Sequence, residues 1–164
     1  MRVFGVDPGL HICGYAGMDF EGSAERIVEA GIVRTQRSLP IERRLHQIAV
    51  DIESLLDKFK PNMVAVEAVY SHYAHPRTAI LMGHARGVIL QKCAAAGIEV
   101  KSYNATRIKK SLTGNGHASK EQMQRTIQTV LALPEIPRPP DVADAMAAAL
   151  CCANDMLTRA WSDK

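Results

Sequence analysis

The sequence has no long apolar run and no arrangement typical of an export signal, and each absence excludes a class of protein. No apolar stretch approaches the roughly 20 residues that a membrane-spanning helix needs. We therefore expect no membrane span and no membrane partner. The first residues, Met1 to Val3, lead directly into a strand pattern rather than a signal peptide. The sequence thus predicts a cytoplasmic protein.

The chain also has no C-x-x-C pair, which argues against a structural zinc or redox site. We expect buried free thiols at all four cysteines, which are Cys13, Cys93, Cys151 and Cys152. His72 and His75 have no cysteine or carboxylate nearby to complete a zinc site, so we interpret them as surface loop residues. The sequence assigns no role to His11 or His117.

Net charge is small and composition is ordinary. The 164 residues are the length of one domain, so we expect a single domain over residues 1–164. Twenty Lys and Arg against 17 Asp and Glu give +3, too little by itself to indicate a nucleic-acid partner. If several acids gather in one site, however, the remaining surface is more basic than this total.

Hydrophobic periodicity predicts an α/β fold with five strands. Alternating residues at 2–7, 12–19 and 26–34 favour an antiparallel meander of three strands. An amphipathic helix over 40–59 comes next. The predicted elements that follow are a strand at 63–66, a helix at 76–96 closed by Gly97, a strand at 98–103, and helices near 105–113, 119–132 and from 139 to about 159. This order predicts a five-stranded mixed sheet, strands 1–3 antiparallel and the last two parallel, with helices on both faces.

Four carboxylates stand at strand ends and at one helix start. Asp7 ends the first strand, Glu67 ends the fourth, and Asp141 and Asp144 lie one turn apart at the start of the last helix. Taken singly, each has an ordinary explanation as a turn residue, an exposed strand end or a residue favoured by the helix dipole. Asp144, however, borders a face of small apolar residues, and no Lys or Arg lies within 139–158 to balance it.

These four acids predict a metal site. Adjacent parallel strands would bring Asp7 and Glu67 to one edge of the sheet, where open α/β sheets bind ligands, and the last helix can bring Asp141 and Asp144 there. Ionised carboxylates so close together require counter-charge, and oxygen ligands select Mg²⁺ or Mn²⁺. Four acids suffice for two ions, which clamp the attacking and leaving oxygens of a phosphoryl displacement. The pattern therefore predicts metal-dependent phosphodiester hydrolysis.

Four sequence segments carry a family resemblance. They are Val3 to Gly9 followed by Gly14-Tyr15, Val64 to Glu67, Gly83 to Gly87, and Asp141 to Ala145. In this order and spacing they resemble RuvC, a bacterial family of Holliday junction resolvases, over nearly the whole chain. The resemblance implies a ribonuclease H-like fold and a homodimer. It also implies paired symmetric nicking of two like-polarity strands at four-way junction DNA, with two Mg²⁺ or Mn²⁺ ions per site, in recombination and DNA repair. Asp7, Glu67, Asp141 and Asp144 fall on the family's acidic positions, and the RuvA and RuvB branch-migration proteins are implied partners.

The resemblance further implies residues that contact DNA. Tyr70 falls where the family usually has a phenylalanine that stacks on a junction base, and a phenol still offers a face for stacking. Lys109 and Lys120 match family lysines near the scissile phosphates. Arg107 and Lys110 extend this basic run, which suits contacts with backbone phosphates. The open alternatives are a partly buried loop aromatic at Tyr70 and a solvated helix face at Arg107 and Lys110.

The helix over 76–96 is apolar around much of its circumference, which calls for a second packing partner. Gly83 and Gly87, four residues apart, allow close approach of another backbone. This helix, with Ile80, is therefore the candidate two-fold interface. The alternative is tight packing of the glycines on the protein's own sheet.

Three other functions are weighed against this one. A YqgF-like ribonuclease H-fold nuclease acting on RNA is typically shorter and is not expected to carry both the glycine-paired helix and all four acids. Actin-like ATPases and sugar kinases also begin with a strand ending in Asp-x-Gly, but they need two such domains. A non-catalytic junction-binding protein would use the acids for helix capping and the basic run for binding.

Overall fold

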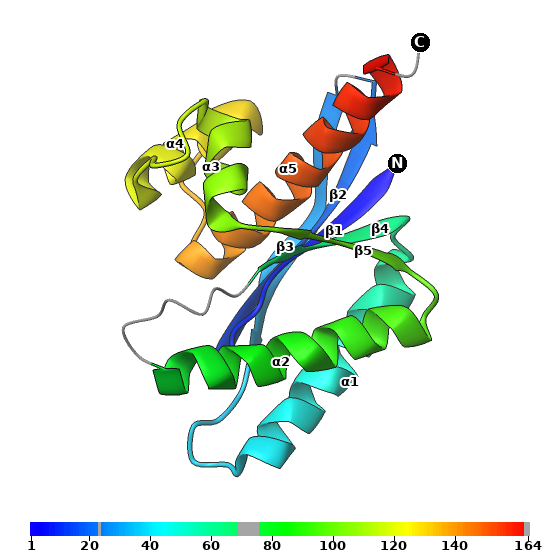
Figure 1. Cartoon of the computed structure of the whole chain (residues 1–164), viewed down its shortest axis with the longest axis vertical. Coiled ribbons are helices and arrows are strands. Elements are labelled where there is room, and N and C mark those ends of the chain that lie inside the picture. The colour runs from blue at the N-terminus through cyan, green and yellow to red at the C-terminus, as the bar shows by residue number, and fades with distance from the viewer. Residues whose placement is uncertain (23, 69–75, 163–164) are drawn as a thin grey trace.

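The computed structural model describes residues 1–22, 24–68 and 76–162, within which five strands form one mixed sheet (Figure 1). The strands are β1 (Arg2–Asp7), β2 (Ile12–Glu21), β3 (Ala24–Arg34), β4 (Met63–Glu67) and β5 (Glu99–Tyr103), in the spatial order β3-β2-β1-β4-β5. The first three are antiparallel, whereas β4 runs parallel to both β1 and β5. The predicted sheet is therefore confirmed.

Helices cover both faces of this sheet. On one face lie α1 (Ile41–Phe59) and α2 (Pro76–Ala95), and on the other lies α5 (Pro140–Ser162), flanked by α3 (Ala105–Thr113) and α4 (Lys120–Val130) (Figure 1). Every predicted element is present, with ends that differ by a few residues. The largest shortening is in α4, because Ser119 is its N-cap and Ala132 has a positive φ of 47°.

The alternation of side chains along β1 and β4 decides on which face of the sheet Asp7 and Glu67 lie. Phe4, Val6, Val64 and Val66 are fully buried against α1 and α2. Their neighbours in sequence point to the opposite face, because successive strand residues alternate. Asp7 directly follows Val6 and Glu67 directly follows Val66, so both acids end their strands on the α5 side of the sheet.

The backbone of α5 lies directly against β1 and β2. A Cβ atom added to Gly5 would lie 2.0 Å from the carbonyl oxygen of Ala145, and one added to Gly14 would lie 2.0 Å from that of Asp141. The facing residues of α5 are small and buried, with Ala145 and Ala148 at 0% exposure. Any larger side chain at these strand positions would push the helix start away from the end of β1.

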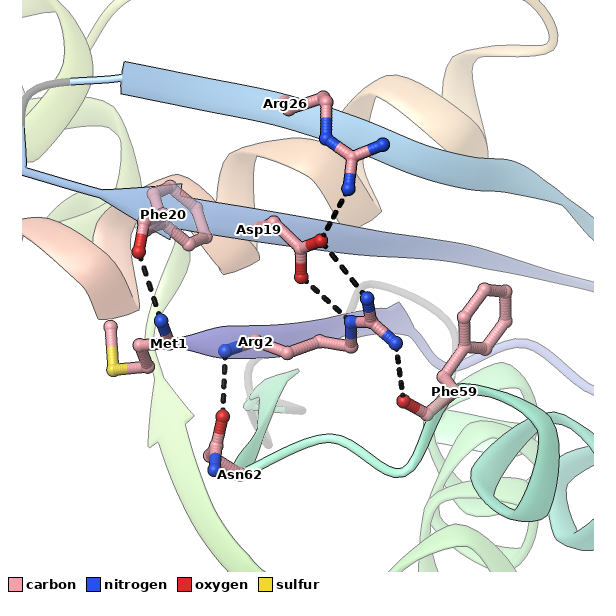
Figure 2. A network of polar contacts seen from close by, with 7 residues as sticks. All are labelled: Met1, Arg2, Asp19, Phe20, Arg26, Phe59 and Asn62. Carbon is pink, nitrogen blue, oxygen red and sulfur yellow. Dashed lines mark hydrogen bonds and ion pairs between the residues drawn. The ribbon is translucent and has the colours of Figure 1, made fainter.

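A network of ion pairs fixes the opposite end of the sheet (Figure 2). The Arg2 guanidinium donates two hydrogen bonds to the Asp19 carboxylate, of 2.7 and 2.9 Å, and a third of 2.9 Å to the carbonyl oxygen of Phe59. Arg26 donates a further 2.7 Å bond to Asp19. The two arginines hold the pKa of Asp19 below its usual range. This network joins β1, β2, β3 and the end of α1, and so opposes any slip in strand register.

Two predictions from composition can be compared with the structure. All four cysteines are free and buried, as predicted. Across the described part of the chain, no helix is long and apolar enough to cross a membrane, even though α5 has 23 residues.

Gly5→Ala should destabilise the fold more than Gly17→Ala, because its new methyl group would meet backbone rather than a movable side chain. At Gly17 the added Cβ would lie 3.0 Å from the ring of Phe59, which can shift. Overpacking costs about 1–3 kcal/mol. In urea denaturation we expect the free energy of unfolding to fall by about 3 kcal/mol for Gly5→Ala and about 1 kcal/mol for Gly17→Ala. Equal losses would show that α5 moves freely over the sheet.

Candidate active site

Three carboxylates from three elements line one cavity. Val6 of β1 is in register with Val66 of β4, so the next residues, Asp7 and Glu67, end their strands side by side. Asp144 joins them from α5, and the three acids line a cavity of about 380 Å³. The predicted meeting of the two strand ends with the start of the last helix is therefore present in the structure.

Asp141 lies at the margin of this cavity. It is in the first turn of α5, and its carbonyl oxygen is the atom that approaches Gly14. Gly14 is the residue of β2 that pairs with Asp7, so this close contact fixes the helix start beside Asp7. Although Asp141 does not line the cavity, its charge raises the pKa of both Asp7 and Asp144.

Burial and mutual repulsion disfavour ionisation of the acids. Burial is the largest cause that raises the pKa of Asp7, to about 8, and the charges of Glu67, Asp144 and Asp141 add to it. The pKa of Glu67 is raised by burial and then by the charge of Asp144. Burial also raises the pKa of Asp144. The site therefore holds more negative charge than its surroundings neutralise.

Two lysines supply part of the missing positive charge. Lys109 of α3 and Lys120 of α4 line the same cavity as the acids. The Lys120 ammonium lies 4.0 Å from a carboxylate oxygen of Asp144, and the lysine side chain is 80% exposed. An exposed pair at this distance contributes little, so Lys120 offsets the charge of Asp144 without cancelling it.

The donor set fits a hard divalent cation. Among the described residues, no three or more acidic, histidine or cysteine side chains already form a group that could hold a metal ion by itself. Mg²⁺ does not need one, because it is usually held by one or two carboxylates together with waters and substrate phosphate oxygens. The buried carboxylates with raised pKa values are the groups whose ionisation a cation would favour. Asp7, Glu67 and Asp144 would hold such an ion.

The other wall of the cavity is apolar, and no functional role was predicted for it. Its main residues are Met82 of α2, Ala105 and Ile108 of α3, Met123 of α4 and Ala147 of α5. Helical periodicity places such residues in the core, and it cannot separate a core position from the wall of a cavity. The cavity can therefore receive an apolar group beside a charged one.

The turn after Asp7 is anchored by a second feature that had no sequence signal. Thr35 is 3% exposed, and its hydroxyl donates a 2.6 Å hydrogen bond to the carbonyl oxygen of Leu10. Arg44 of α1 donates to the Thr35 hydroxyl at 3.1 Å and to the same Leu10 oxygen at 3.2 Å. The backbone N–H of Thr35 also donates to the carbonyl oxygen of His11 at 3.0 Å. These bonds hold the chain that leaves the acidic site.

Among the remaining predicted DNA contacts, Arg107 and Lys110 do not line the cavity. Tyr70 lies outside the described residues, together with His72 and His75. Arg107 forms an ion pair with Asp155 of α5 and lies over the ring of Tyr103, 5.8 Å from its centre. Lys110 is exposed on α3. The contact of these residues with DNA stays a prediction.

The proposed interface helix presents its glycines to open space. A Cβ added to Gly83 or Gly87 would meet no atom of the described residues within 4 Å, so the alternative of tight packing on the protein's own sheet is wrong. Ile80 on the same helix is 61% exposed. Both glycines line a groove between α1 and α2, whose other walls include Leu45 and Val88.

The raised pKa of Asp7 predicts that Asp7→Asn stabilises the metal-free protein, and more so at high pH. Below about pH 4 the carboxyl is protonated in both folded and unfolded chains. Between that pH and about 8 the unfolded chain releases a proton that the folded chain retains, so stability falls as the pH rises. Unfolding in EDTA should show a gain for Asp7→Asn that grows over this interval and levels off above it. A gain independent of pH would contradict this account.

Comparisons with known proteins agree with this geometry. The family model described as "Crossover junction endodeoxyribonuclease RuvC" matches residues 3–152. The RuvC of Rhodopirellula baltica is 46% identical over 149 residues, covering 91% of this chain and 84% of that protein. The Thermus thermophilus RuvC structure has a TM-score of 0.89 at 33% identity over 97% of both chains. That protein in complex with a Holliday junction substrate has a TM-score of 0.91 at 32% identity, covering 97% of this chain and 96% of that one. The fold is therefore ribonuclease H-like, as predicted, and the chain belongs to the RuvC family of crossover junction endodeoxyribonucleases.

Proposed function

We propose that this chain resolves four-way DNA junctions by hydrolysing phosphodiester bonds at the cavity lined by Asp7, Glu67 and Asp144. The family is one of metal-dependent nucleases. The observation that carries the proposal is the convergence of three acids from β1, β4 and α5 in one cavity, with Lys109 and Lys120 at its edge. Such a site suits a phosphate group that arrives together with divalent cations.

In this proposal the carboxylates bind the cations and the lysines bind the phosphate. Asp7, Glu67 and Asp144 would hold two ions, Mg²⁺ or Mn²⁺, and Asp141 would support them from the first turn of α5. When bound, these ions lower the pKa of a water and stabilise the charge on the attacking and leaving oxygens. Lys109 and Lys120 contact the phosphate oxygens and so balance charge that the acids do not. Water then adds to phosphorus as the P–O bond to the leaving oxygen breaks, which leaves one strand nicked.

Two copies of the chain would place two such sites on one junction. We propose that they associate through α2, where Gly83 and Gly87 are open and Ile80 is largely exposed. A two-fold dimer brings identical sites to symmetry-related strands, which is the arrangement that paired nicking of like-polarity strands requires. Tyr70 would stack on a base near the crossover, and Arg107 and Lys110 would contact backbone phosphates.

The proposed substrate also indicates protein partners and a location in the cell. A resolvase acts on junctions that a branch-migration complex supplies, so RuvA and RuvB are the proposed partners. The proposed DNA substrate supports a cytoplasmic location.

Asp7→Asn should abolish cleavage and leave junction binding nearly unchanged. A metal ion contributes several kcal/mol to the transition state, and each ~1.4 kcal/mol is tenfold in rate. We therefore expect the cleavage rate to fall at least about a hundredfold. The measurement uses a labelled synthetic four-way junction with Mg²⁺, Mn²⁺ or EDTA, and binding is followed in EDTA. Asp57→Asn, at an exposed position of α1, is the control. Binding by the unaltered chain without nicking in any metal would favour a non-catalytic junction-binding protein.

Gly87→Leu should convert dimers into monomers without harming the fold. A Cβ atom added at Gly87 meets no atom of the described residues within 4 Å, and leucine favours a helix by about 1 kcal/mol over glycine. Size-exclusion chromatography with light scattering should show a monomer at a concentration at which the unaltered chain is a dimer. Thr129→Leu, which adds the same side chain at an exposed position of α4, should remain dimeric. A dimeric Gly87→Leu variant would remove this face of α2 from the interface.

A further inference from the structure

We propose that Arg34, Arg37 and Arg43 form a second phosphate-binding surface, which contacts a duplex arm of the junction on the far side of the cavity from Lys109 and Lys120. The inference rests on the proposed function, since it assumes a DNA substrate. We call these three residues the arginine margin.

The arginine margin lies at the same end of the sheet as the acids. Arg34 ends β3 and pairs with Ile12 of β2, while Gly14 of β2 pairs with Asp7. The strand order puts β3 two strands from β1, whereas β4, β5 and then α3 follow on the other side. Because neighbouring strands lie about 4.8 Å apart, the backbone of Arg34 is roughly 10 Å from β1.

The segment that carries the margin is fixed relative to Asp7. Arg44 turns inward, where it and Thr35 bind the carbonyl oxygen of Leu10, three residues after Asp7. Thr35 directly follows Arg34, and Arg43 precedes Arg44 in the first turn of α1. Phosphates bound by the margin would therefore sit at a defined position relative to the cavity.

Among the described residues, no acidic side chain forms an ion pair with the arginine margin. Residues 34–44 contain four arginines and one acid, Glu42. Several exposed cations elsewhere bond carboxylates, as Arg26 does with Asp19, Lys58 with Glu29 and Arg125 with Glu121. Within residues 1–22, 24–68 and 76–162, the exposed side chains of the arginine margin have no such ion pair.

Phosphate is the anion that suits this surface. A guanidinium group presents parallel N–H donors that match two phosphate oxygens, and it is less strongly hydrated than an ammonium group. With lysines on the α3 side and arginines on the β3 side, a strand that enters the acidic cavity has a basic surface on either side. Contacts of this kind position DNA without reading its sequence.

The test compares two triple variants of equal charge. One replaces Arg34, Arg37 and Arg43 with glutamine. The control replaces Arg26, Lys58 and Lys60 with glutamine, at the end of the sheet where Arg2 binds Asp19 and the carbonyl oxygen of Phe59. Anisotropy of a labelled four-way junction in EDTA gives the dissociation constant as salt is varied. Each lost phosphate contact lowers the salt slope by about 0.9.

For the margin variant we expect the salt slope to be shallower by about 2 to 3, and binding at about 0.1 M salt to be at least tenfold weaker. The control should change the slope by less than about 1. Replacing the three arginines with lysine should retain most of the affinity, because charge is kept. All variants should melt within a few degrees of the unaltered protein.

The outcomes are distinguishable. An unchanged slope in the margin variant, or an equal loss in the control, would overturn the inference while the unaltered protein still binds and cuts junctions. Failure of the unaltered protein to bind or cut any junction would instead overturn the proposed function.

Discussion

Direct contact between the backbone of α5 and the backbones of β1 and β2 sets the position of the candidate site. The carbonyl oxygens of Ala145 and Asp141 occupy space that side chains at Gly5 and Gly14 would fill. Both contacts lie within the first two turns of α5, where Asp141 and Asp144 stand. The acids at the start of α5 therefore lie beside the end of β1, because the glycines at positions 5 and 14 have no side chain that would hold the helix away. Small buried residues further along α5, such as Ala149, continue the same contact.

This contact holds together groups that repel one another. Burial and like charge raise the pKa of Asp7, Glu67 and Asp144, so each carboxylate would be more readily ionised in an unfolded chain. Apolar burial on both faces of the sheet must offset that cost. Stabilising polar networks lie away from the cavity, around Asp19 at the far end of the sheet and around Thr35 behind the turn. A site that favours cation binding is thus also a source of instability when no cation is present.

Local patterns in the sequence were enough to predict the sheet, the helices and the meeting of Asp7, Glu67 and Asp144. The alternation of side chains along a strand predicts which face of the sheet Asp7 and Glu67 lie on. The spacing of residues along a helix predicts that Asp144 lies beside buried alanines. What could not be predicted depends on contacts between distant parts of the chain. Lys120 lies 24 residues before Asp144 in the sequence, and Arg44 reaches back to the carbonyl oxygen of Leu10. No periodicity encodes such pairs, because they depend on how the helices are placed after the sheet forms.

The same limit explains why net charge was a poor guide to the partner. The net charge of +3 is a sum in which the acids of the cavity offset basic residues around it. In the folded chain these charges are separated: Asp7, Glu67 and Asp144 line the cavity together with Lys109 and Lys120. Arg34 ends β3, and Arg34, Arg37 and Arg43 form no ion pair among the described residues. On the proposed function, the basic edges attract a DNA strand while the carboxylates repel its phosphate until cations bind between them. Binding and cleavage would therefore depend on different charges, and a chain of low net charge can still act on a polyanion.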